Sequence, residues 1–129
     1  KRPTAPACND LAENLRQQKR LSEAEPFARQ ALAIQPDSAP ALDTLACILL
    51  DTQRFGEAAQ LSEQAVKLSP KTPGLQLTLL RVRVKQKDDA GMIRLLDELK
   101  STKTPIPEDL LQEIHLLRRA SASVIQPKG

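Results

Sequence analysis

The sequence predicts an all-α fold made of three helix hairpins and one final helix. Apolar and small residues recur at intervals of three and four, as they do on the buried face of an amphipathic helix. The pattern is clearest in residues 42–70, where two such helices are joined by a short turn. A shift of 34 residues places Ala24 on Ala58, and repetition at this period is typical of helical repeat arrays.

The first hairpin should contain helices at about 7–19 and 23–34. Ser22 and Glu25 have the spacing of a capping box, which predicts the start of the second helix. Pro26 then falls in the first turn of that helix, where the missing N–H costs little.

The later helices follow from the same spacing and from their terminal residues. The second hairpin should consist of helices at 40–52 and 56–68. In the third hairpin, Asp88 or Asp89 can cap a helix that ends near Lys100.

The stretch from Leu75 to Val84 allows two interpretations. Its apolar residues alternate with polar ones, which locally indicates a strand. Leu75, Leu79 and Val82 also share one face of a helix, however. An isolated strand would have no partner in an otherwise helical chain, so we expect this stretch to be the first helix of the third hairpin.

A final helix is expected at residues 107–119, opening at Pro107, whose fixed φ suits a first helical position. Acidic residues in its first turn and Arg118 and Arg119 in its last turn complement the helix dipole. A helix of this kind would cap the array. The expected organisation is a lead-in at 1–6, a repeat domain at 7–119 with repeats at about 5–38, 39–72 and 73–104, and a loose tail at 120–129.

Composition and motifs argue against several functions. No run of about 18 apolar residues is present, so no membrane span is expected. Lys and Arg exceed Asp and Glu by only 19 to 16, and with 2% aromatic residues there is little to stack nucleic-acid bases on, so nucleic acid is not an expected partner. No Gly-rich phosphate loop or metal-ligand spacing occurs, and His115 has no nucleophile or orienting carboxylate. We expect no enzymatic activity, no cofactor and no metal.

The two cysteines, Cys8 and Cys47, lie on the first helices of neighbouring hairpins. Buried free thiols are the expected state, with a disulfide between them as the alternative.

The repeated pattern resembles the tetratricopeptide repeat, in which Leu and a small residue on the first helix are followed by Ala on the second and by a terminal Pro. The matching pairs are Leu11 and Leu45, Ala12 and Ala46, Ala24 and Ala58, Ala31 and Ala65, and Pro36 and Pro70. The resemblance covers residues 6–100, with two close repeats and one looser one. It implies antiparallel helix pairs stacked in a right-handed superhelix, whose first helices line a concave groove that receives peptides or protein segments.

Carried over residue by residue, the resemblance implies a mixed groove that is acidic in its middle and basic at its C-terminal end. The implied lining is Asn9, Glu13, Arg16, Gln17, Asp43, Cys47, Leu50, Asp51, Leu77, Arg81, Val84 and Lys85. Members of the family that clamp a chaperone's C-terminal carboxylate use Lys, Asn and Arg. The corresponding positions here are Asn9, Glu13, Thr44, Gly74 and Thr78. Only Asn9 suits such a clamp, so that ligand class is not expected.

The expected function is therefore a non-enzymatic scaffold that binds a protein or peptide on its concave face. The alternative is a structural spacer or self-association segment of a longer repeat protein. Residues 40–46 also look like the last repeats of bacterial proteins tied to exopolysaccharide production and protein export, which favours a bacterial parent, cytoplasmic or periplasmic. We expect a monomeric fragment of a larger protein, because Asn14 and Glu25 make the first hairpin's outer face more polar than Ile48 and Ala59 do in the second.

Overall fold

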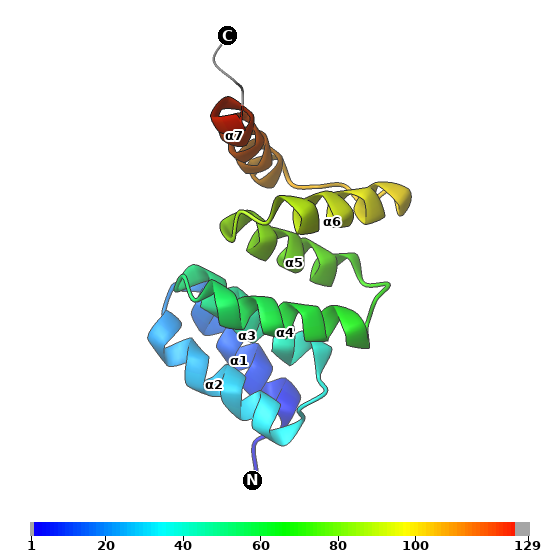
Figure 1. The fold of residues 1–129 in the computed structure, drawn as a ribbon. Helices are drawn as coiled ribbons and strands as arrows, with labels where there is room; N and C mark the ends of the chain where they lie inside the picture. The colour runs from blue at the N-terminus through cyan, green and yellow to red at the C-terminus, as the bar shows by residue number, and fades with distance from the viewer. Residues whose placement is uncertain (1, 126–129) are drawn as a thin grey trace.

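Figure 1 shows helices stacked in chain order from the N-terminus to the C-terminus. The computed structural model describes residues 2–125, with side chains as far as Ala120. Within those residues it contains seven helices and no strand, which confirms the predicted all-α fold. The helices are α1 (Ala5–Gln17), α2 (Leu21–Ile34), α3 (Ala39–Asp51), α4 (Phe55–Leu68), α5 (Pro73–Lys85), α6 (Asp89–Ser101) and α7 (Glu108–Ile125).

The helices pack as a linear series of hairpins. α1 packs on α2, α3 on α4 and α5 on α6, and the second helix of each of the first two hairpins also packs on the first helix of the next. The first helices α1, α3 and α5 contact one another in turn, and α7 contacts α5 in the same way. α7 therefore takes the position that the first helix of a fourth hairpin would occupy.

Two main clusters of buried side chains form the core. The first lies mostly in α1–α4 and combines the large residues Leu45 and Leu49 with alanines such as Ala12 and Ala58, all at most 1% exposed. Small residues at these positions let neighbouring helices approach closely. The second cluster joins α5, α6 and α7 and includes Leu80, which is 0% exposed.

The turns inside the three hairpins share one backbone conformation. Lys19, Gln53 and Lys87 have φ values of 62°, 63° and 57°, in the left-handed region. In the second hairpin the Arg54 N–H then donates to the Leu49 carbonyl at 2.8 Å, and the same bond occurs after the other two residues. This is the Schellman motif, which satisfies carbonyls at a helix end. The 34-residue spacing of these turns extends the repeat into the third hairpin, whose helices match it only weakly.

α5 is helical from Pro73 to Lys85, so the helical interpretation of the alternating stretch is confirmed. Its buried residues lie on nearly all sides because α3, α4, α6 and α7 all contact it. A helix that is packed all round does not show the one-sided periodicity of a surface helix. This packing explains why the stretch looks like a strand in sequence.

Both ends of the chain are more helical than predicted. α1 already begins at Ala5, so residues 5–6 of the predicted lead-in at 1–6 are helical. Thr4 caps the helix, because its Oγ1 accepts a hydrogen bond from the Ala7 N–H at 3.2 Å. α7 continues to Ile125, so residues 120–125 of the predicted tail are helical and Arg118 and Arg119 do not lie in the last turn. Lys1 and residues 126–129 of the predicted ends lie outside the described residues.

The predicted capping box of Ser22 and Glu25 is also wrong. α2 begins at Leu21, and no side chain caps it. The Glu25 carboxylate instead pairs with Arg29 and with Arg54 of the next hairpin. Glu25 therefore contributes to a contact between hairpins, although the local sequence predicts that it caps a helix.

The earlier start of α2 places Pro26 beyond the first turn, inside the helix. Proline there supplies no N–H for the Ser22 carbonyl and crowds that carbonyl. Pro26 is exposed, so its ring has little packing to lose. We expect Pro26→Ala to raise the free energy of unfolding by about 1–2 kcal/mol, somewhat less than the full penalty of a mid-helix proline. Urea denaturation followed by circular dichroism measures this, and a less stable variant would contradict the explanation.

Candidate functional site

The implied groove residues lie on α1, α3 and α5, the three first helices that contact one another in series. Most of them are half-buried or exposed. Val84 is the exception, because it is only 4% exposed and packs in the core cluster that α7 completes. Leu50 and Leu77 also pack partly against core clusters. Val84 should therefore be removed from the candidate ligand surface.

At the α1 side of the groove, an ion-pair group joins α1 to α3. Arg16 binds Glu13 at 2.8 Å on its own helix and Asp51 of α3 at 3.4 Å. The hydrogen bond from Arg16 holds the pKa of Glu13 below its ordinary value. Two acidic residues thus share one arginine.

At the other side, α7 changes the expected charge of the groove. Arg81 pairs with Asp109 at 3.4 Å, and Lys85 pairs with Glu113 at 2.9 Å. The prediction of a basic C-terminal end is therefore wrong, because the last helix neutralises both cations. The sequence did contain a signal for this. Arg81 and Lys85 are four residues apart on one helix, and Asp109 and Glu113 are four residues apart on another, so each pair lies on one face of its helix and the two faces can pair.

Cys47 lies in the middle of the groove, with its Sγ 3.9 Å from the Oγ1 of Thr78 on α5. Burial raises the pKa of the Cys47 thiol to about 12. A thiol with that pKa stays protonated at neutral pH and is a poor nucleophile. Cys8 and Cys47 are both free, as expected from the sequence; Cys8 is buried, but Cys47 is only partly buried.

Asp43, one turn before Cys47, is the least compensated charge in the groove. Its Oδ1 is buried and has no hydrogen-bond partner among the described residues, and the same is true of Asn9 Oδ1 on α1. None of the ion pairs within residues 2–120 includes Asp43. Burial raises the pKa of the Asp43 carboxyl above its ordinary value. A hydrogen bond with Thr78 and the Arg16 charge lower this pKa in part, while the Glu13 charge raises it.

Asp43 also lines a recess of about 290 Å³ between the first turns of α3 and α5. The other lining residues are Ala39, Pro40, Ser69, Thr72, Gly74 and Leu75. Sequence reasoning missed this recess as a site. Its one signal was Gly74, a glycine in a helix where no turn requires it: its φ is not positive, and an added Cβ would meet nothing within 4 Å.

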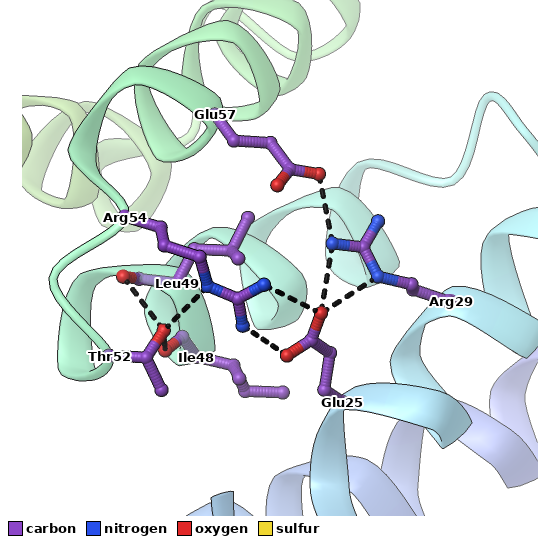
Figure 2. Close-up of polar contacts among 7 residues, drawn as sticks. All are labelled: Glu25, Arg29, Ile48, Leu49, Thr52, Arg54 and Glu57. Carbon is purple, nitrogen blue, oxygen red and sulfur yellow. Dashed lines mark hydrogen bonds and ion pairs between the residues drawn. The ribbon is translucent and has the colours of Figure 1, made fainter. Parts of the chain in front are cut away.

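On the side of the array opposite the groove, charged side chains of the first two hairpins pair with one another. Figure 2 shows Arg54 and Arg29 directed toward Glu25, with Arg29 also bound to Glu57 at 2.9 Å. Arg54 Nε donates to Thr52 Oγ1 at 3.2 Å. The hydrogen bond from Arg54 holds the pKa of Glu25 below its ordinary value. These ion pairs link α2 to the first turn of α4 and so connect the first two hairpins.

His115 is exposed on α7. No helix within residues 2–125 has the length and apolar character needed to cross a membrane.

Comparison with known families agrees with the repeat seen in the structure. A sequence model described as tetratricopeptide repeat matches residues 4–35, and a second model of the same description matches residues 39–72. Together they cover just over half of the chain and coincide with the first two hairpins. No curated protein matches the chain.

Proposed function

The chain belongs to the tetratricopeptide repeat family, whose members generally mediate protein–protein interaction or scaffolding, and we propose that it binds a protein or peptide segment along α1, α3 and α5. The family is typically non-enzymatic. The proposal adds the place of binding to that general role.

The observation that carries the proposal is the contrast between the two sides of the repeat array. On the outer side, the charged residues of the first two hairpins satisfy one another across the interface between α2 and α4. On the groove side, Asn9 and Asp43 each hold a buried oxygen without a partner, and Asp43 also lines an open recess. The third such atom among the described residues, Ser62 Oγ of α4, belongs to a residue that is only 1% exposed, so a ligand has no access to it. Buried polar atoms normally have partners, so this side is the one that gains most from a bound chain.

A specific observation also supports the alternative, self-association. A recess of about 300 Å³ at the N-terminal end is lined by apolar residues that include Ala7, Phe27 and Leu11, which is 42% exposed. Glu25 was expected to make the N-terminal face of the first hairpin polar, but its carboxylate pairs with Arg54 of the second hairpin instead. The expectation of a monomer now depends on Asn14 alone, which is exposed.

The groove proposal predicts where selected ligands bind. Short random peptides displayed as a library and selected on the protein should shift backbone amide signals of α1, α3 and α5 in nuclear magnetic resonance spectra. Gln17→Trp should weaken binding about tenfold, a loss of about 1.4 kcal/mol. Gln17 is an exposed groove residue, so its indole would occupy the space of the bound chain.

The matched control is Gln64→Trp, the same change at an exposed residue of α4. It should leave the affinity unchanged. Shifts confined to α2, α4 and α6 would contradict the groove. Failure to select any peptide, together with concentration-dependent dimers that Leu11→Glu abolishes, would favour the self-association alternative instead.

A further inference from the structure

We propose that the recess between α3 and α5 receives a lysine or arginine side chain of the segment bound in the groove, held by the Asp43 carboxylate. The inference rests on the proposed groove function and adds the chemistry of its ligand. Gly74 stands at a position of the family's carboxylate clamp but has no side chain with which to bind a carboxylate, and the sequence pattern assigns no ligand to Asp43.

The shape and lining of the recess suit a long side chain with a polar head. Ala39, Pro40 and Leu75 supply apolar surface, and Asp43 supplies the charge. Gly74 has no side chain, so it does not narrow the recess. A Cβ added there would meet nothing within 4 Å, so the space beside it is open. Lysine and arginine pack their apolar stems on such surface while their charged heads reach polar groups.

The burial of the Asp43 carboxylate favours a positively charged ligand group over a neutral or acidic one. The carboxylate is largely removed from water, and Oδ1 accepts no hydrogen bond. A buried charge without a partner is unfavourable, and an opposite charge brought close relieves it. A lone carboxylate is too few ligands for a metal ion, whereas one lysine or arginine head needs only one acidic partner.

The surrounding charges act in the same direction. Glu13 and Asp51 share the single cation Arg16, so with Asp43 the middle of the groove carries more negative than positive charge. The cations on the α5 side, Arg81 and Lys85, are already paired with α7. An acidic segment would therefore meet repulsion at the middle of the groove and no free partner among these cations.

The helix ends at the recess oppose this charge only in part. Ser38 Oγ already accepts from the Ala41 N–H at 3.2 Å, so a side chain caps the first turn of α3. Thr72 provides no side-chain cap for α5, whose N-terminus carries a partial charge of about +0.5. Asp43, Glu13 and Asp51 together carry three negative charges, against Arg16 and a partial charge of about +0.5 at the N-terminus of each of α3 and α5, so the groove around the recess remains negative.

A ligand-binding role for Asp43 has a signature that a structural role lacks. A residue that holds the fold together is destabilising to remove, whereas Asp43 is a desolvated charge that belongs to no ion pair and whose Oδ1 accepts no hydrogen bond. Asp43→Asn should therefore unfold at an equal or higher denaturant concentration than the natural protein, while losing about tenfold or more in affinity for a lysine-containing peptide.

The experiment is a random-peptide selection on four proteins: the natural chain, Asp43→Asn, Gly74→Leu and Asp97→Asn. Gly74→Leu keeps the carboxylate but fills the recess, and Asp97→Asn is the same change of Asp to Asn at an exposed residue of α6, away from the groove. Peptides from the natural chain should share one lysine or arginine position. That preference should disappear with the first two variants and persist with the third. Replacing the shared lysine by norleucine should then cost about tenfold in affinity for the natural chain and little for Asp43→Asn.

The possible outcomes separate this inference from the groove proposal. Peptides that bind the groove without a shared cation, or with one that Asp43→Asn retains, would overturn the inference and leave the groove proposal standing. A shared Ser, Asn or acidic position in place of the cation would also overturn it. If no peptide is selected at all, both proposals fail together.

Discussion

Leu49→Ala is expected to lower the free energy of unfolding by about 2–5 kcal/mol, the range for truncating a fully buried leucine. Leu49 is 0% exposed, in the core cluster that joins the first two hairpins. Several of its neighbours in that cluster are alanines, among them Ala12 and Ala58, which have no flexible atoms to move into the space. The cavity should therefore persist. Guanidinium denaturation followed by circular dichroism measures the loss.

The control is Leu116→Ala, the same truncation on α7, where the leucine is 66% exposed. It should change the free energy of unfolding by no more than about 0.5 kcal/mol. Similar losses from the two variants would show that the first cluster is not the packed core described above.

The fold was largely predictable because its information is local and repeated. Ala24 and Ala58 mark the close approach of helices, and both are 0% exposed in the structure. Gln53 shows the limit of this reasoning: its left-handed backbone ends a helix although it is not glycine, the residue usually expected there. The repeat fixed the position of that turn even though the residue type did not signal it.

The errors occurred where a distant helix decided the role of a side chain. Glu25 was assigned to a helix cap and instead pairs with Arg54, 29 residues later in the chain. Lys85 was expected to be a free groove cation and instead pairs with Glu113 of α7. The recess beside Asp43 arises only when the first turns of α3 and α5 come together. The spacing within one helix does not name the partner helix: the four-residue spacing of Arg81 and Lys85 becomes informative only when it is compared with that of Asp109 and Glu113 on α7.

Leu80→Ala is expected to destabilise the C-terminal half of the array selectively. Leu80 is 0% exposed in the cluster shared by α5, α6 and α7, which is distinct from the cluster of the first two hairpins. In a repeat array each unit contacts only its neighbours, so damage remains partly local. The truncation should cost about 2–5 kcal/mol. Hydrogen exchange should therefore accelerate much more in α5–α7 than in α1–α4.

The same variant connects stability to function, because α5 supplies Gly74 and Leu75 to the recess beside Asp43. When α5 unfolds locally, the recess loses the residues that α5 contributes, while α1 and α3 remain packed. Peptide binding should therefore be lost at a lower denaturant concentration than the helical signal of α1–α4. Leu49→Ala should show the reverse order of exchange, with α1–α4 affected first. If Leu80→Ala accelerates exchange equally in all the helices, the array unfolds as one cooperative unit, and the separation into two clusters has no energetic meaning.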